Sequence, residues 1–322
     1  MKRRTLLSLL SLLPFAAVPA FAQERIYRLG MLSTGPASIS AFRRWALPEL
    51  ARQGFVEGRN LILHSRSSEG QTEALPTLAR EIAASKPDVI VAVSNPVAHV
   101  LRAIVPDVPI VMGFAGTDPV ADGLVASLSR PGGLVTGVVM LAEELDIKRF
   151  EFATEVVPAA RRIGYLVGST ASEARVAAIE GVARRLGIEL VVARSTGSDG
   201  YGAAFAALSA ARVEAVLVAS FPGFASNAQS LAKRALAAGV PSFCEWRHMA
   251  EAGCLVGYGA VWGDLQRRVG LYVARIFLGE APGDMAMERA ARFELVVNLK
   301  TATELGLTVP GSLLARADEL IE

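Results

Sequence analysis

Short apolar segments alternate with longer amphipathic segments along most of the chain, and this alternation constrains the fold more than any other feature of the sequence. In the first half, amphipathic stretches separate apolar segments at residues 26–32, 60–66, 88–93, 109–114 and 134–138. Repeated strand–helix units build a parallel sheet that is covered by helices on both faces. The first half therefore predicts a doubly wound α/β array.

The pattern pauses after the turn-forming segment Arg130-Pro131-Gly132-Gly133, and the same alternation begins again after the short strand at residues 134–138 and a helix from about Glu143. The second set of apolar segments comprises residues 161–167, 188–193, 215–219, 241–244 and 255–258. A glycine-containing crossover at residues 136–141 joins the two sets. A chain of about 300 residues exceeds what one hydrophobic core usually holds. We therefore expect an α/β protein of two similar doubly wound parallel-sheet lobes.

The N-terminus has the order of a secretory signal peptide. Lys2, Arg3 and Arg4 precede an apolar run from Leu6 to Val18, and Ala20-Phe21-Ala22 supplies the small residues of a cleavage site. The apolar run is shorter than the roughly 20 residues that a membrane span needs. We expect residues 1–22 to be removed and the mature chain to reach the periplasm. The arginine pair leaves both the general and the twin-arginine export routes open.

Charge and cysteine content exclude several classes of partner and cofactor. The net charge is +2 for the whole chain, and removing the three basic residues of the signal leaves the mature chain at −1. Such scattered charge gives no electrostatic footprint for nucleic acid. Cys244 and Cys254 are compatible either with a disulfide in an oxidising compartment or with two small buried side chains. Neither their number nor their spacing suits a metal site, and we expect no cofactor.

Polar and aromatic residues follow the predicted strands in both arrays. In open parallel sheets, ligands bind beyond the carboxyl ends of the strands. Each serine, threonine or asparagine there is also compatible with an ordinary helix N-cap, but their joint position on both arrays favours a cleft for a small polar or amphipathic molecule. These residues are Ser33, Thr34, Ser94, Asn95, Thr117 and Asp118 in the first array, and Ser169, Thr170, Ser220, Phe221, Glu245, Trp246 and Tyr258 in the second.

Motifs of catalysis are missing from the sequence. His64, His99 and His248 are far apart and lack metal-ligand spacing. There is no H-E-x-x-H zinc motif, no P-loop and no G-x-S-x-G nucleophile elbow. A binding protein is therefore favoured, and an exported enzyme acting on a small metabolite is the alternative.

Several stretches together resemble one family. They are residues 54–60 (Gly-Phe-Val-Glu-Gly-Arg-Asn), 86–91, 117–120, 123–133, 293–300 and 312–319. On these stretches the chain resembles the bacterial ABC transporter substrate-binding proteins that include tryptophan- and tyrosine-type binders. The resemblance spans essentially the whole mature chain.

The resemblance implies a type I periplasmic-binding-protein fold, in which a hinge joins two lobes that close on a solute. The first lobe would hold residues 23–138 and 262–290, and the second residues 139–261 and 291–322. The protein would act as a monomer and pass its solute to an ABC permease in the inner membrane. A sensory or chemotaxis binding protein on the same fold is the alternative.

The resemblance also places the family's ligand loops on the strand-end residues, and their chemistry suggests roles in binding. If the solute is an amino acid or a similar acid, hydroxyl and backbone N–H groups after Ser33, Ser94 and Ser169 would hold its carboxylate. Asp118 or Glu245 would hold its ammonium group. Phe221, Trp246 or Tyr258 would pack on an apolar part of the solute. Residues 94–96 (Ser-Asn-Pro) and 168–171 (Gly-Ser-Thr-Ala) depart from the family's usual loops, so the ligand does not follow from any one relative.

Overall fold

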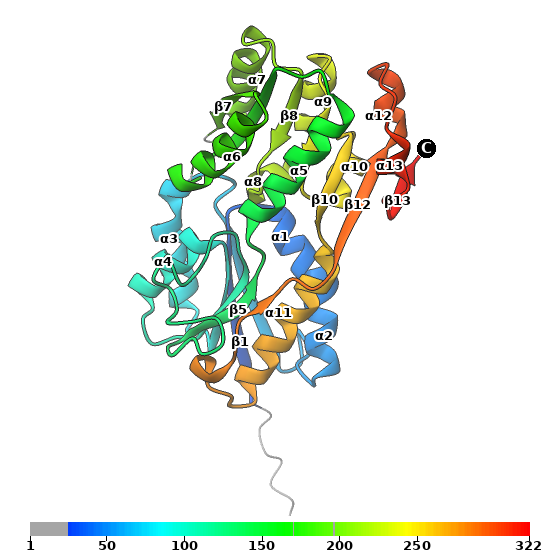
Figure 1. Ribbon diagram of the computed structural model, residues 1–322. Helices are drawn as coiled ribbons and strands as arrows, with labels where there is room; N and C mark the ends of the chain where they lie inside the picture. The colour runs from blue at the N-terminus through cyan, green and yellow to red at the C-terminus, as the bar shows by residue number, and fades with distance from the viewer. Residues whose placement is uncertain (1–24, 170, 196) are drawn as a thin grey trace, which may run out of the picture.

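Two separate β-sheets organise the computed structural model, which describes residues 25–169, 171–195 and 197–322. The predicted signal peptide and Thr170 lie outside the described residues. One sheet and its helices form the first lobe, and the other sheet with its helices forms the second (Figure 1). The prediction of two doubly wound α/β lobes is confirmed.

The first-lobe sheet has six strands, and every pairing in it is parallel. In spatial order the strands are β11 (Glu288–Arg289), β5 (Val135–Val139), β4 (Ile110–Ala115), β3 (Val89–Val93), β1 (Tyr27–Ser33) and β2 (Leu61–Ser67). All five residues of β3 are buried, as expected for a strand covered on both faces. The helices of this lobe are α1 (Pro36–Ala41), α2 (Leu47–Arg52), α3 (Leu75–Ala84), α4 (Asn95–Ile104) and α11 (Trp262–Phe277).

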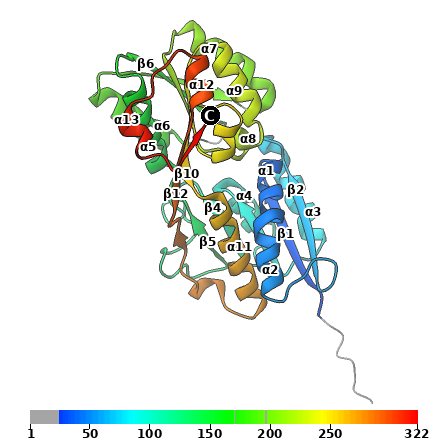
Figure 2. The same ribbon diagram turned by 90° about the vertical axis from the view of Figure 1, so that its right-hand side faces the viewer.

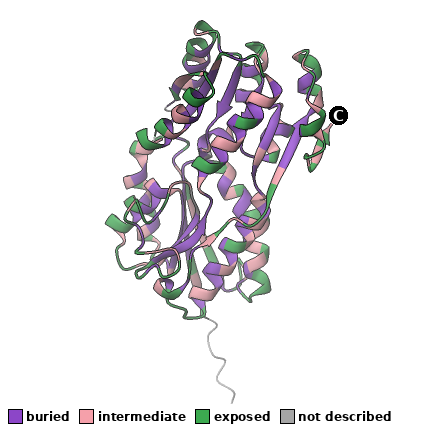
Figure 3. Cartoon of the chain, in the orientation of Figure 1, coloured by how far each residue is buried: buried purple, intermediate pink, exposed green. Residues whose placement is uncertain are grey.

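The second-lobe sheet has seven strands and contains one antiparallel pair, β10 with β12. Its order is β13 (Glu319–Ile321), β12 (Phe293–Asn298), β10 (Val256–Ala260), β9 (Ser242–Cys244), β8 (Ala215–Val218), β6 (Arg162–Gly168) and β7 (Glu189–Ser195). The helices are α5 (Ala142–Val156), α6 (Glu173–Arg185), α7 (Tyr201–Ala210), α8 (Pro222–Ser226), α9 (Ala228–Ala237), α10 (Arg247–Glu251), α12 (Leu299–Glu304) and α13 (Gly311–Leu314). In both lobes the strands are mostly buried and the helices expose their outer faces (Figure 3).

The chain passes between the lobes three times. It crosses after β5 at residues 140–141, after β10 at residue 261, and after β11 at residues 290–292. Figure 2 shows β10 and β12 running from the junction into the second lobe. Neither lobe is therefore formed by one continuous stretch of sequence.

A glycine in β5 is required by the close approach of β4. Gly137 has φ +129°, and a Cβ atom there would lie 2.4 Å from the backbone oxygen of Met112. No other residue fits this position without moving backbone atoms.

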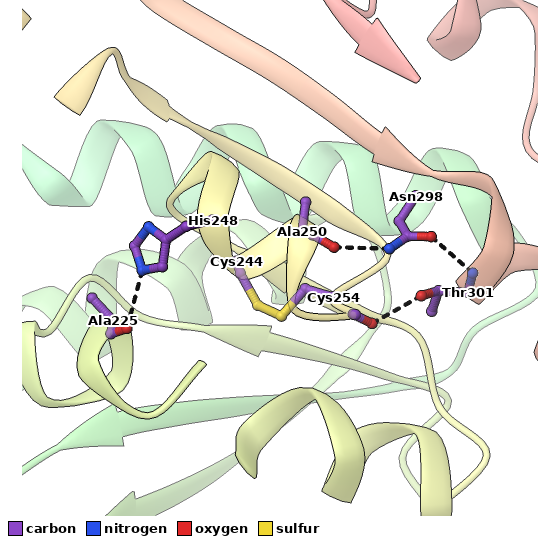
Figure 4. The surroundings of a disulfide bond; sticks show 8 residues. Ala225, Cys244, His248, Ala250, Cys254, Asn298 and Thr301 are labelled. Atoms are coloured by element: carbon purple, nitrogen blue, oxygen red, sulfur yellow. Dashed lines mark hydrogen bonds between the residues drawn. A yellow bond between two sulfur atoms is a disulfide. The ribbon is translucent and has the colours of Figure 1, made fainter. Parts of the chain in front are cut away.

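Cys244 and Cys254 form a disulfide, which resolves the alternatives left by the sequence (Figure 4). Both cysteines are fully buried, at the end of β9 and just before β10. The segment between them is also tied to the start of α12, since Asn298 Nδ2 donates to Ala250 O at 2.8 Å and Thr301 Oγ1 donates to Gly253 O at 3.0 Å. The loop that carries Glu245 and Trp246 is thus fixed at both ends.

Candidate functional site

A cavity of about 250 Å³ lies where the carboxyl ends of strands from both lobes meet. Its walls combine polar side chains with a few apolar surfaces. The lining residues are Ser94, Asn95, Pro96, His99, Gly116, Thr117 and Asp122 from the first lobe, and Gly168, Ala171, Ser172, Arg175, Ser220 and Phe221 from the second. The position of the cavity agrees with the rule that ligands bind beyond the carboxyl ends of parallel strands.

The first-lobe wall is organised by Asn95, which begins α4. Its Nδ2 donates to Asp122 Oδ2 at 2.6 Å, and its Oδ1 accepts from the Gly116 N–H at 3.1 Å. The Thr117 hydroxyl donates to the same oxygen of Asp122. These bonds hold the loop after β4 against α4 and place one carboxylate in the wall.

Ser94 precedes α4 in a strained backbone conformation. Its φ is +111°, which a residue with a side chain rarely adopts. Its Oγ is buried and has no hydrogen-bond partner among the described residues. Backbone strain and an unsatisfied buried hydroxyl are features that proteins keep at binding sites, where a ligand supplies the missing contact.

The second-lobe wall contains a cation and an aromatic ring. Arg175 lies near the start of α6, where the Ser172 side chain caps the helix by accepting from the Arg175 N–H at 3.3 Å. The Phe221 ring packs directly on the backbone of Gly168, because a Cβ at Gly168 would lie 2.7 Å from the ring. This wall therefore offers positive charge beside an apolar surface.

Arg175 belongs to a buried ionic cluster behind the wall. Its Nε donates to Asp146 Oδ2 at 2.8 Å, and Asp146 also accepts from Arg149 and from the Tyr165 hydroxyl. Asp146 and Arg149 are fully buried, and Arg175 is 7 % exposed. Burial alone would lower the pKa of Arg175, but the Asp146 carboxylate outweighs it and the pKa is raised. Burial, helped by the negative charge of Asp146, also raises the pKa of the Tyr165 phenol.

The cluster ties the two helices to strand ends beside the cavity. Arg149 Nη1 donates to the Tyr258 carbonyl at 2.9 Å, and its Nη2 donates to Ser220 Oγ at 3.1 Å. Arg175 Nη1 donates to the Ser220 carbonyl at 3.1 Å. The position of Ser220 in the cavity wall is therefore set by two buried arginines.

Glu245 completes this group of charges. Its side chain is buried, Oε1 has no partner among the described residues, and burial raises its pKa to about 7 despite the nearby charge of Arg149. A Cβ at Gly259 of β10 would lie 3.2 Å from Glu245 Cγ, so β10 packs directly against this side chain. A carboxyl group with this pKa is half neutral at neutral pH.

The structure brings together five of the residues expected from the strand ends. Ser94, Asn95, Thr117, Ser220 and Phe221 all line the cavity.

Seven other expected residues lie outside its lining, and one of them, Trp246, packs against Trp262 at the lobe junction. The Ser33 hydroxyl bonds within the turn before α1, and Thr34 is buried beside it with its hydroxyl unpaired among the described residues. Asp118 and Ser169 are exposed, and the Asp118 carboxylate accepts from the Val120 N–H at 2.9 Å. Glu245 is behind the wall, and the Tyr258 ring packs edge-on against Phe152 at 5.1 Å.

Sequence reasoning missed four polar residues of the lining: His99, Asp122, Ser172 and Arg175. They lie one turn into a helix or within a loop, whereas the expected positions were confined to strand ends. The sequence nevertheless holds a signal for the charged cluster. Arg149 falls on the same helical stripe as Leu145, Phe152 and Val156, which are all buried. A charged residue on an apolar stripe needs a buried partner.

All three tryptophans of the chain gather at the lobe junction. Trp262, at the start of α11, stacks on Trp246 of the second lobe at 5.1 Å between ring centroids. The ring centroid of Trp45 in the first lobe lies 6.2 Å from that of Trp262. This stack links the lobes next to one of the crossings.

The sequence profile of the ABC transporter substrate-binding proteins matches residues 38–321. The chain belongs to this family. A tyrosine-binding protein of Clostridioides difficile (strain R20291) is 24% identical over 273 residues, which cover 84% of this chain and 78% of that protein.

Two solved structures share the fold. An ABC domain from Streptococcus pneumonia, described as a complex with L-Trp, aligns with a TM-score of 0.80 at 24% identity, covering 92% of this chain and 100% of the other. A substrate-binding protein of Clostridium difficile, described as ligand-free and open, aligns with a TM-score of 0.61 at 23% identity, covering 92% and 99%.

Family membership establishes the general activity. This substrate-binding protein binds a small-molecule solute and is not an enzyme. Proteins of the family deliver their solutes to a membrane permease. Within residues 25–169, 171–195 and 197–322, no helix is long and apolar enough to cross a membrane, and no group of three or more His, Cys, Asp or Glu side chains is arranged to hold a metal ion.

Proposed function

We propose that this substrate-binding protein captures an amino acid in the periplasm and delivers it to an ABC importer as a monomer. The observation that carries the proposal is the cavity with walls from both lobes. It sets the Asp122 carboxylate on the first-lobe wall and the Arg175 guanidinium on the second. An amino acid has an ammonium and a carboxylate group to match them, and Phe221 offers a surface for an apolar side chain.

Relatives support this class of solute. One is a tyrosine-binding protein and another is described with bound L-Trp. A cavity of about 250 Å³ is also in the range of a small metabolite rather than a peptide or a polymer. Ser94, Asn95, Thr117, Ser220 and Phe221 are the proposed contact residues.

Capture proceeds by closure of the two lobes around the solute. The proposed lobe boundaries fall at residues 138/139, 261/262 and 290/291, close to the three crossings. The TM-score is higher with the L-Trp complex than with the ligand-free, open protein, although identity and coverage are similar. The Ala37 N–H of α1 also donates to Ser226 Oγ of α8 at 3.2 Å, which joins the lobes. Both observations support a closed arrangement in this structure.

A thermal-shift screen of the chain from residue 23 tests the proposal, with L-tryptophan, L-tyrosine, the other amino acids, sugars and inositols as ligands. A ligand that binds only the folded state adds about 2.7 kcal/mol at a hundredfold excess over Kd. We expect a large shift with one class of amino acids. A shift with sugars or inositols alone contradicts the proposal.

A substitution that fills the cavity tests whether the solute binds there. Ala171 lines the cavity outside any helix, so Ala171→Phe should abolish the shift and leave the melting temperature of the free protein unchanged. The control is Ala206→Phe, which adds the same ring at an exposed position of α7. Retained binding in Ala171→Phe would place the solute elsewhere.

A further inference from the structure

We infer that Arg175 takes the anionic group of the solute and that Glu245, buried behind it, gains a proton as the solute is captured. This inference rests on the proposed function, because it assumes a solute with a carboxylate group.

Arg175 is held in place with donors to spare. A guanidinium has five N–H groups. Among the hydrogen bonds of the described residues, three use Arg175 donors: two reach Asp146 Oδ2 and one reaches the Ser220 carbonyl. The residue also lines the cavity, at the amino-terminal end of α6, where the helix dipole adds positive potential. A carboxylate in the cavity thus meets a cation whose orientation Asp146 has already fixed.

The charges behind the wall balance only when Glu245 is ionised. From α5 the cluster contains Asp146 and Arg149, and from α6 it contains Arg175. When Glu245 is neutral, these groups carry one positive charge without a buried counterpart. When Glu245 is ionised, the four charges sum to zero.

Two further elements pack against Glu245, and neither adds a charge. The loop after β8 contributes the Ser220 side chain, which interacts with Glu245 and is itself part of the cavity wall. From β10 the neighbour is Gly259, which carries no ionisable group. The charges of Arg149, Asp146 and Arg175 act on the pKa of Glu245.

A solute carboxylate and an ionised Glu245 compete for the same positive charge. Bound solute supplies the missing negative charge, so it favours the neutral form of Glu245. Since burial raises the pKa of Glu245 to about 7 before any solute charge is added, this shift occurs at neutral pH and requires uptake of a proton. Affinity for a carboxylate ligand should then weaken as pH rises, by at most about tenfold per pH unit.

The test measures binding of L-tryptophan and L-tyrosine by calorimetry from pH 6 to 8, in two buffers of different ionisation enthalpy. We expect uptake of up to about half a proton at pH 7. Glu245→Gln, which is neutral at every pH, should take up none and should bind with an affinity that does not vary over this range. Tryptamine and tyramine, which lack the carboxylate, should bind Arg175-containing protein at least tenfold more weakly.

Two control variants show whether Glu245 takes up the proton and whether Arg175 holds the carboxylate. His99 also lines the cavity, and His99→Gln should retain the proton uptake of the unmodified protein. Arg175→Lys keeps a cation with fewer donors and should weaken L-tryptophan binding at least tenfold while leaving tryptamine binding unchanged. If Arg175→Lys does not fold, the Glu245→Gln measurement still decides.

Failure of the inference and failure of the proposed function give different results. Binding of the amino acids without proton uptake, or with uptake that persists in Glu245→Gln, overturns the inference and leaves the proposed function intact. Equal affinity for L-tryptophan and tryptamine also overturns the inference and leaves the proposed function intact. If no amino acid binds in the thermal-shift screen, the proposed function is overturned and the inference falls with it.

Discussion

Replacing Asp146 by asparagine should destabilise the second lobe far more than its conservative chemistry suggests. The Asp146 carboxylate is fully buried and accepts hydrogen bonds from Arg149, Arg175 and Tyr165. Asparagine keeps the shape but removes the charge that both guanidinium groups face. Removing one partner of a buried ion pair costs about 3–5 kcal/mol. This is a large part of the roughly 5–15 kcal/mol that stabilises a typical domain.

The same helix provides a matched control. Lys148 and Glu151 form a second ion pair with the same three-residue spacing on α5, but their side chains are 41% and 52% exposed. Solvent screens such a pair, and it contributes at most about 1 kcal/mol. Glu151→Gln should therefore change stability by less than this amount, although it makes the same chemical replacement one turn further along the helix.

Urea unfolding at pH 7, followed by circular dichroism and by tryptophan fluorescence, measures both variants. Two probes are needed because two lobes need not unfold in one transition. We expect the midpoint of Asp146→Asn to fall steeply and to be insensitive to added salt, because buried charges are poorly screened. If Asp146→Asn is no less stable than Glu151→Gln, the buried cluster does not hold α5 and α6 to the sheet and the reasoning is refuted.

Three further substitutions probe other features. Burial raises the pKa of Glu245 from 4.5 to about 7, so its contribution to the free energy of unfolding is fully present below pH 4.5 and is lost as the pH rises through 7. Relative to Glu245→Gln, the unmodified protein should lose about 3 kcal/mol of stability across this window, as measured by urea unfolding at several pH values. Parallel pH profiles of the two proteins would contradict this prediction. The Cys244→Ala/Cys254→Ala variant opens a disulfide loop with a sequence separation of 10 and should lose about 2–3 kcal/mol relative to the oxidised unmodified protein. The reduced unmodified protein should be weakened by the same amount, and equal stability of the oxidised protein and the variant would contradict the prediction. Gly137→Ala places a methyl group against the Met112 backbone and should cost more than about 2 kcal/mol in thermal unfolding, whereas an unchanged melting temperature would show that β4 and β5 separate easily.

The sheets could be predicted because their sequence signal is local. β3 reads as Val-Ile-Val-Ala-Val, and a strand buried on both faces needs such an uninterrupted apolar run. The π-helical turn between α1 and α2 could not be predicted from a local signal. The amphipathic stretch after residues 26–32 does not form one continuous α-helix, because the structure has α1, a π-helical turn at Phe42–Ala46 and then α2, with Pro48 near the start of α2. That turn presents Phe42 and Ala46 to the core, which depends on packing against α11 from far along the chain.

The candidate site was predicted in part, for a related reason. Strand ends locate loops, so Ser94, Asn95 and Ser220 followed from the positions of the strands. Arg175 lies in a helix, and its exposure to the cavity depends on how α6 is anchored by Asp146 of α5. Whether Cys244 and Cys254 were joined also depended on a distance between strands that spacing alone does not give. Local sequence patterns do not predict contacts between elements that are distant in sequence.

The three crossings have a consequence for the order in which the molecule is made. A chain emerges from the ribosome or through a membrane channel with its amino terminus first. The first lobe cannot be finished at that stage, because α11 and β11 are synthesised after most of the second lobe. The second lobe in turn waits for β12 and β13, at the very end of the chain. Both lobes therefore complete their sheets only when nearly all residues have been synthesised.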